Sequence, residues 1–140
     1  MKYIFLFFYC VNVAFAWEMQ ENNGQVYLRD TRYNMNEKIS ALSGDTKKEM
    51  IIKELNKELT LITYLANVGG TKEVSYTYNC SLYSKKLKKL IFKDNICKTI
   101  SKNIKKNATD VSSEVTEASF VIHSNEIIYK YEELVEKYAE

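Results

Sequence analysis

The sequence predicts an α+β fold, in which a helix packs on an antiparallel β-sheet and an additional amphipathic helix ends the chain. Apolar and polar residues alternate on both sides of a glycine pair, Gly69 and Gly70, which is the period-two pattern of a β-hairpin. Apolar residues recur at helical spacing after Thr46 and again after Ser124. Because an apolar helix stripe needs a surface to cover it, the two patterns together favour helices on a sheet.

The first sixteen residues are expected to be a secretory signal peptide. Lys2 precedes an apolar run from Tyr3 to Val13, and Ala14-Phe15-Ala16 supplies the small residues of a cleavage site. A membrane-spanning helix needs about 18 or more apolar residues, and this run is too short. We therefore expect a secreted, extracellular protein of residues 17–140, with a single domain and no stable membrane anchor.

The cysteines and two sequons agree with an extracellular location. Cys10 leaves with the signal peptide, so Cys80 and Cys97 remain, and an even pair in a secreted protein predicts one disulfide bond. Asn79 and Asn107 begin Asn-x-Ser/Thr sequons and are candidate glycosylation sites of a glycoprotein. In an alternating strand Asn79 faces away from Cys80, toward solvent. The alternative to glycosylation is that Asn79 is an unmodified surface asparagine.

The N-terminal elements are weakly patterned. Trp17 to Asn36 lacks clean periodicity and is expected to be a mobile arm ahead of a short extended piece, Gln25 to Leu28. Sparse apolar residues between Asp30 and Leu42 predict a helix, which Ser43-Gly44-Asp45 ends.

A better-defined helix is predicted from Thr46 to Leu59. Thr46-Lys47-Lys48-Glu49 fits a capping box, in which the hydroxyl and the carboxylate satisfy free backbone amides. Its apolar stripe consists of Ile51, Ile52, Leu55, Leu59 and Ile62.

The hairpin from Thr60 to Tyr83 follows, as the period changes from 3.6 to 2. Each strand presents one apolar face to a core. The shared faces are Ile62, Tyr64, Ala66 and Val68 on the first strand, and Val74, Tyr76, Tyr78, Cys80 and Leu82 on the second.

The C-terminal half is expected to contain a second hairpin, a loop, a strand and a helix. Leu90 to Phe92 and Ile96 to Ile100 flank a turn at Asp94-Asn95, which allows Cys97 to reach Cys80 across neighbouring strands. The loop is Ser101 to Glu114, the strand is Ala118 to Ile122, and the helix is capped by Ser124, with Ile127, Ile128, Tyr131, Leu134, Val135 and Tyr138 on its stripe.

Charge is unevenly distributed, although the formal net charge is only +2. Between Lys85 and Lys106 the one acid is Asp94, whereas the segment from Asn107 onward is acidic. Such a pattern favours an acidic glycan or another extracellular protein as the partner of a basic patch. The alternative is that the two segments neutralise each other or are solvated faces. The patch consists of Lys85, Lys86, Lys88 and Lys89.

The sequence contains no recognisable catalytic motif, so we do not expect an enzyme. His123 is the one histidine and has no cysteine or paired acid at metal-ligand spacing. No nucleophile elbow surrounds a serine, and Gly69-Gly70 lacks the lysine of a phosphate loop. We expect a binding protein, with no catalytic residue, metal, cofactor or nucleic-acid partner.

The predicted order of helix, strand, glycine turn and strand resembles the cystatin fold. Ser43-Gly44-Asp45 with the following helix looks like the beginning of insect-type members, and Leu65 to Lys72 looks like the family's first inhibitory hairpin, of pattern Gln-x-Val-x-Gly. The resemblance implies non-covalent inhibition of papain-like cysteine peptidases. It also implies three contact residues, Gly24 in an N-terminal trunk and Val68 and Gly69 in the hairpin.

The chain departs from that pattern in several ways. Leu65 or Ala66 replaces the glutamine, the tryptophan-bearing second hairpin is missing because Trp17 is the one tryptophan, and the chain has no proline. The leading hypothesis is a secreted cystatin-like inhibitor of cysteine peptidases. The alternative is a non-inhibitory secreted effector that binds a receptor or an acidic glycan through its lysine-rich face. A third hypothesis is a small-ligand carrier lined by Tyr64, Tyr76 and Tyr78.

Overall fold

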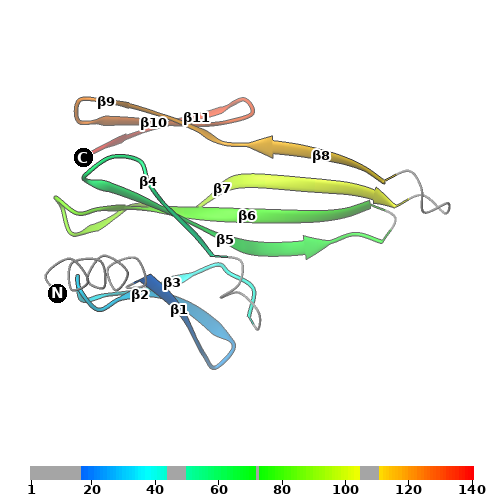
Figure 1. The fold of residues 1–140 in the computed structure, drawn as a ribbon, viewed down its shortest axis with the longest axis horizontal. Coiled ribbons are helices and arrows are strands. Elements are labelled where there is room, and N and C mark those ends of the chain that lie inside the picture. The colour runs from blue at the N-terminus through cyan, green and yellow to red at the C-terminus, as the bar shows by residue number, and fades with distance from the viewer. Residues whose placement is uncertain (1–16, 44–49, 72, 105–110) are drawn as a thin grey trace, which may run out of the picture. The chain divides into compact units, whose positions relative to one another are not determined.

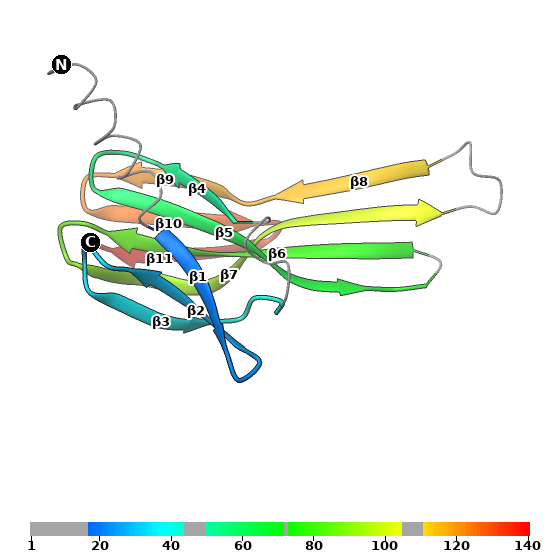
Figure 2. The ribbon, with the colours of Figure 1, turned by 60° about the horizontal axis from the view of Figure 1, so that its bottom comes forward.

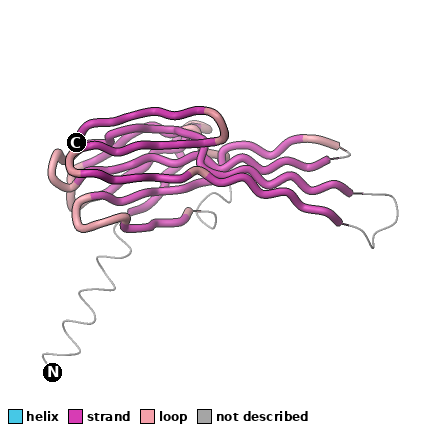
Figure 3. The backbone as a smooth tube through the Cα atoms, turned by 90° about the horizontal axis from the view of Figure 1, so that it is seen from above, coloured by secondary structure: helices cyan, strands magenta, loops and turns pink. Residues whose placement is uncertain are grey.

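The fold is all-β. The computed structural model describes residues 17–43, 50–71, 73–104 and 111–140, and every regular element in these ranges is a β-strand (Figures 1 and 3). The chain divides between Ile39 and Ser40 into two compact units. The predicted α+β fold class is therefore wrong, and three antiparallel sheets replace the helix-on-sheet arrangement. The predicted signal peptide lies outside the described residues.

The smaller unit is a three-stranded antiparallel sheet in the order β1-β2-β3. Alternate residues such as Met19 and Leu28 are buried, as period-two strands require. An Asn23-Gly24 turn joins β1 to β2, with φ of 54° and 75°, values that favour this dipeptide. The expected mobile arm is thus an ordered hairpin. The strands are β1 Trp17–Asn22, β2 Gln25–Asp30 and β3 Met35–Ile39.

The helix predicted between Asp30 and Leu42 is also wrong, because Asp30 closes a turn. Its Oδ1 accepts a hydrogen bond from the Arg32 backbone N–H at 2.8 Å, and its Oδ2 pairs with the Arg32 guanidinium at 2.9 Å. This side-chain bond to the backbone competes with helix formation. The chain then returns as β3, in which Ile39 pairs with Val26.

The larger unit contains two sheets. A five-stranded antiparallel sheet has the order β4-β5-β6-β7-β8, and a three-stranded sheet has the order β11-β10-β9. The first consists of β4 Ile51–Glu54, β5 Leu59–Gly69, β6 Glu73–Ser84, β7 Lys89–Ile104 and β8 Val111–Glu117. The second consists of β9 Ser119–His123, β10 Glu126–Tyr131 and β11 Leu134–Ala139.

The predicted central hairpin is confirmed as β5 and β6, with one change of register. Leu65 pairs with Tyr78 and Asn67 with Thr77, so Ala66 forms a β-bulge. The bulge moves Val68 from the face of Ile62 and Tyr64 to the opposite face of the sheet. Val68 consequently pairs with Tyr76, on the face that also carries Leu61 and Leu82.

The helix predicted from Thr46 is wrong over its described residues. Ile51–Glu54 is strand β4, and residues 44–49, which include the whole predicted capping box, lie outside the described residues. Asn56 sets the turn that follows, because its Oδ1 accepts hydrogen bonds from the backbone N–H groups of Glu58 at 2.8 Å and Leu59 at 2.9 Å. The β4–β5 hairpin results.

The predicted C-terminal helix is a hairpin as well. Ile127 and Tyr129 are buried on β10, and Ile127 lies opposite Tyr138 of β11 instead of sharing a helix face with it. Glu132 takes a positive φ of 53° in the turn between the strands. The predicted strand at Ala118 to Ile122 is confirmed as β9.

The predicted hairpin around Asp94-Asn95 is replaced by one long strand. Strand β7 continues through Asp94, whose φ of 61° belongs to a bulge opposite Ser81. Residues 101–104, expected to begin a loop, are still part of β7, and Val111 to Glu114 belong to β8.

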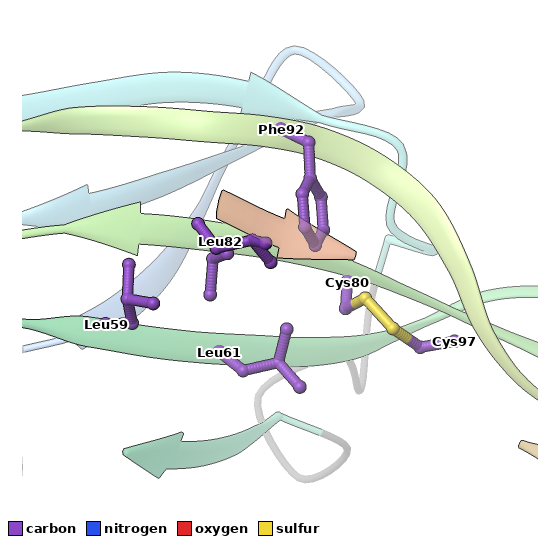
Figure 4. Close-up of a cluster of buried hydrophobic side chains, with 7 residues drawn as sticks. Leu59, Leu61, Cys80, Leu82, Phe92 and Cys97 are labelled. Atoms are coloured by element: carbon purple, nitrogen blue, oxygen red, sulfur yellow. A yellow bond between two sulfur atoms is a disulfide. The ribbon is translucent and has the colours of Figure 1, made fainter. Parts of the chain in front are cut away.

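The core of the larger unit lies between its two sheets (Figure 4). Phe92 is its aromatic centre, with ring centroids 6.0 Å from Phe120, 5.9 Å from Tyr129 and 5.0 Å from Tyr138. The predicted disulfide between Cys80 and Cys97 is confirmed, with a Cα–Cα distance of 5.7 Å. The buried cluster comprises Leu59, Leu61, Cys80, Leu82, Phe92, Cys97 and Ile127.

Four strands of the larger sheet extend beyond the three-stranded sheet (Figures 1 and 2). We call this part of β5 to β8 the extension; its described residues are 65–70, 73–78, 98–104 and 111–117. The β6–β7 turn lies at the opposite end of the same strands (Figure 1).

Candidate functional site

The β6–β7 turn is the strongest candidate site because four lysines gather on it. Ser84 holds the turn: its carbonyl accepts a hydrogen bond from the Lys88 N–H at 2.8 Å, and its Oγ accepts one from the Leu87 N–H at 3.1 Å. Lys88 takes a positive φ of 55°. The short turn therefore presents Lys85 to Lys89 in a small area.

The lysines of this turn differ in their partners. Lys85 forms an ion pair with Glu54 at 2.9 Å. Lys86, Lys88 and Lys89 are exposed, and within the described ranges no carboxylate lies within 4 Å of their ammonium groups. These three cations are consequently available to an external anion.

The neighbouring β4–β5 turn joins this surface. The Lys85 N–H donates a hydrogen bond to the Glu58 carbonyl at 2.8 Å, which brings the exposed Lys57 and Glu58 alongside. Ser84 Oγ also donates to Glu140 at 2.8 Å. The surface thus mixes five lysines with the carboxylates of Glu54, Glu58 and Glu140, and it retains a cationic excess.

The remaining described part of the lysine-rich stretch is partly neutralised. Lys98 lies 3.6 Å from Glu117 across β7 and β8. The Lys102 ammonium lies 5.5 Å from the ring centroid of Tyr76. Among the described residues, the acidic segment therefore forms an ion pair with Lys98 but none with the lysines of the β6–β7 turn, while Lys105 and Lys106 lie outside the described residues.

The predicted peptidase contacts occupy two turns. Val68 is 42% exposed near the end of the β5–β6 hairpin, and Gly69 next to it has space for a side chain. Gly70 is the residue that the turn requires, because its φ is +100° and a Cβ there would lie 1.8 Å from the Glu73 carbonyl oxygen. Gly24 lies in the β1–β2 turn of the smaller unit.

A buried polar cluster in the larger unit was missed by the sequence analysis. Tyr64 is fully buried, and its hydroxyl donates to Asp94 Oδ1 at 2.5 Å and lies 2.7 Å from Ser81 Oγ. Burial, followed by the bond to Asp94, raises the pKa of Tyr64 well above its ordinary value. The long-range pairing of β5, β6 and β7 brings the three together, and no local motif announces it.

The three tyrosines of the ligand-carrier hypothesis do not line one cavity. Tyr64 pairs with Asn79, so it lies on the face of the sheet opposite to Tyr76 and Tyr78. Tyr76 and Tyr78 belong to the extension and are half-buried.

His123 lies in an open depression of about 510 Å³ beside the β9–β10 turn. Its neighbours there include Ser124, Glu126 and Lys137. Within the described residues no three histidine, cysteine or acidic side chains are grouped so as to hold a metal ion.

The two sequons differ in what the structure says of them. Asn79 is half-buried in β6, between β5 and β7, and the third residue of its sequon, Ser81, is fully buried. Asn107 lies outside the described residues.

No protein-family model, curated protein or solved structure matches the chain. In the part of the chain that the structure describes, no helix has the length and apolar character needed to span a membrane.

Proposed function

We propose that this is a secreted binding protein that engages an acidic glycan through the β6–β7 turn. The observation that carries the proposal is the exposure of Lys86, Lys88 and Lys89 on one tight turn, with no carboxylate partner among the described residues. Clustered cations attract a polyanion and raise its local concentration. The disulfide between Cys80 and Cys97 supports an oxidising, extracellular location.

Heparin is a suitable probe of this proposal. The triple variant Lys86→Ala, Lys88→Ala and Lys89→Ala keeps Lys85, whose ion pair with Glu54 belongs to the fold. We expect it to bind heparin roughly tenfold or more weakly near physiological salt, since three exposed ion pairs of up to about 1 kcal/mol each are lost. Isothermal titration and elution from a heparin column measure the change.

A charge-matched control separates a site from a general effect of net charge. Lys38, Lys130 and Lys137 are exposed and lie on β3, β10 and β11, away from the turn in sequence. Their triple alanine variant removes the same charge and is expected to keep most of the affinity. Equal losses in both variants, or no retention of the wild-type protein at low salt, would overturn the proposal.

Secretion is part of the proposal and has its own test. When the full chain is expressed in a secretory host, the protein in the medium is expected to begin at Trp17, as N-terminal sequencing or intact mass shows. Retention of residues 1–16 on a secreted protein would contradict cleavage after Ala16.

Inhibition of papain-like peptidases is a second candidate function. It is supported by the exposed Val68, which lies beside a tight turn that requires glycine at position 70. The mature chain is expected to inhibit papain at micromolar concentration and to lose inhibition on Val68→Asp, measured by residual hydrolysis of a fluorogenic peptide. Full peptidase activity in the presence of the wild-type chain would remove this candidate.

A further inference from the structure

The apolar face of the extension is built by one row of side chains across four strands. Val68 pairs with Tyr76, Tyr76 with Ile100, and Ile100 with Val115. Because directly paired residues point to the same side of a sheet, these four side chains lie next to one another.

The two faces of the extension differ in polarity. On the opposite face, the neighbouring row of paired residues is polar and suits contact with water. It consists of Asn67, Thr77, Thr99 and Thr116. On the apolar row Val68 is 42% exposed and Val115 is 51% exposed. The same face carries Leu61 and Leu82 further along the strands, where the three-stranded sheet packs on it. The inner face of this sandwich therefore continues past its cover (Figure 2).

The flanking rows determine what fits on this face. On one side of the apolar row, Tyr78 pairs with Lys98 and Lys98 with Glu117. On the other side, Val74 pairs with Lys102. Both lysines lie on β7, whereas tyrosines and Val74 lie on β6. Lys98 is already paired with Glu117, and the Lys102 ammonium already lies near the Tyr76 ring. An occupant that keeps these contacts places aromatic or aliphatic groups over the lysines and apolar groups over the central row.

We propose that a second copy of this chain packs face to face on the extension, about a two-fold axis parallel to the strands. This axis places β5 over β8 and β6 over β7 of the other copy. Lys98 then lies over an aromatic ring and Lys102 over an aliphatic side chain, which is favourable for an ammonium group and its methylene stem. The facing pairs are Val68 with Val115, Tyr76 with Ile100, Tyr78 with Lys98 and Val74 with Lys102.

The order of the rows disfavours the other face-to-face two-fold arrangement. An axis along the apolar row places Val68 of one copy over Val68 of the other. It also places Lys98 of each copy over Lys102 of the other, so that like charges face each other. Both axes keep the strands of the two sheets aligned, as face-to-face sheet packing requires. The charges therefore distinguish them, and an axis along the strands avoids this repulsion.

Cross-linking distinguishes the two arrangements directly. Facing sheets lie about 10 Å apart, which is too far for a disulfide, so a short bismaleimide is the appropriate reagent. We expect an equimolar mixture of the V68C and V115C chains to form a cross-linked dimer that neither variant forms alone. A V68C dimer formed by that variant alone, or no dimer from the mixture, would contradict the proposed axis.

Sedimentation equilibrium measures the association itself. Ile100→Gln removes an apolar contact from both halves of the dimer and is expected to raise the dissociation constant by about tenfold or more. Ser101→Gln, one residue along β7 and on the opposite face, is the matched control and is expected to leave it unchanged. Thermal unfolding of both variants shows whether the monomer fold is intact. The proposal would be overturned if the wild-type chain stayed monomeric up to about 1 mM, a concentration at which even weak dimers form. Equal weakening of the dimer by both variants would also overturn it.

Discussion

Asp94 is the residue on which three hydrogen bonds of the larger unit converge. Its Oδ1 accepts from the Tyr64 hydroxyl at 2.5 Å and from the Ser40 backbone N–H at 2.9 Å, and its own N–H donates to Ser81 Oγ at 3.3 Å. Tyr64 and Ser81 are fully buried, so they have no access to water as a substitute partner. Through its carboxylate and its backbone N–H, Asp94 therefore joins β5, β6 and β7 by polar groups that are costly to leave unpaired.

We predict that Asp94→Ala lowers the free energy of unfolding by roughly 1–3 kcal/mol, the cost of leaving a buried donor without its acceptor. Asp94→Asn is expected to lose less, because asparagine keeps an acceptor oxygen and tolerates the φ of 61° at this position. Urea unfolding of both variants gives the comparison. Equal destabilisation by Ala and Asn would show that the acceptor is not what matters.

Tyr129 makes the free energy of unfolding fall as the pH rises through the alkaline range. Burial, with smaller contributions from Glu136, Tyr138 and Tyr131, raises the pKa of Tyr129 to about 12, and its hydroxyl donates to the Ile96 carbonyl. The fold thus favours the neutral phenol over the phenolate. The resulting stabilisation is complete below the unfolded pKa of about 10 and is lost as pH rises toward 12.

We predict that the free energy of unfolding falls between about pH 10 and pH 12, and that Tyr129→Phe reduces this fall. Tyr64 and Tyr138 also have raised pKa values, so part of the pH dependence persists in the variant. Chemical unfolding at several pH values measures it. Tyr27→Phe is the control, since that hydroxyl bonds the exposed Gln25. An identical pH profile for wild type and Tyr129→Phe would contradict the assignment.

At the scale of the element, the two adjacent glycines of the β5–β6 turn have different physical roles. A side chain at Gly70 would collide with the Glu73 backbone, at 1.8 Å from its oxygen, whereas no atom lies within 4 Å of a Cβ at Gly69. Gly70 also has φ of +100°, a conformation in which other residues are strained.

We predict that Gly70→Ala destabilises the hairpin by roughly 1–3 kcal/mol, the range for a residue held in a strained backbone region. Gly69→Ala is expected to be neutral or slightly stabilising, since it reduces the entropy of the unfolded chain. Thermal unfolding and backbone amide chemical shifts around Val74 provide the measurement. A larger loss for Gly69→Ala than for Gly70→Ala would contradict this assignment.

The sequence identifies the strands of the central hairpin but cannot separate helix from hairpin elsewhere, for a geometric reason. Residues four apart share a face in both an α-helix and a β-strand. The pairs Ile127 with Tyr131 and Leu134 with Tyr138 have this spacing, and so do Ile51, Leu55 and Leu59. Tyr129 was the discriminating residue, because a buried side chain two positions after Ile127 fits a strand and not a helix stripe.

The candidate site, like the fold, could be predicted from the sequence only in part. The four lysines of the β6–β7 turn are close in sequence, so a local pattern is sufficient to find them. The ion pair of Lys85 with Glu54 and the apolar row of the extension depend on strand order and on the bulge at Ala66. A one-residue insertion reverses the faces of a strand, and the sequence pattern alone predicted the wrong face for Val68.

At the scale of the whole molecule, the disulfide joins β6, the central strand of the larger sheet, to its neighbour β7. Cys80 on β6 and Cys97 on β7 are both in the core and are separated by 17 residues. We predict that the double variant Cys80→Ala with Cys97→Ala loses roughly 3 kcal/mol of unfolding free energy, on the chain-entropy account of a loop of this length. Urea unfolding of the variant and of reduced wild type gives the value. Unchanged stability in both would contradict a structural role.

Dimerisation through the extension would place both β6–β7 turns at the same end of the pair, because the proposed axis runs along the strands and each turn lies at the end remote from the extension (Figure 1). A long polyanion can then bind two turns at once, which raises apparent affinity by about 10²- to 10⁴-fold over one turn. A short oligosaccharide reaches one turn only. We therefore predict that Ile100→Gln weakens binding of long heparin chains by about tenfold or more but leaves binding of a short heparin oligosaccharide unchanged.

The lysine triple variant distinguishes the two contributions in this comparison, since it is expected to weaken binding of both long and short chains. Ser101→Gln, on the opposite face of β7, is expected to affect neither. Isothermal titration at fixed salt with size-fractionated heparin provides the measurement. Equal weakening of long and short chains by Ile100→Gln would mean that the extension contacts the glycan itself, and the bivalent arrangement would be wrong even though the basic turn still binds.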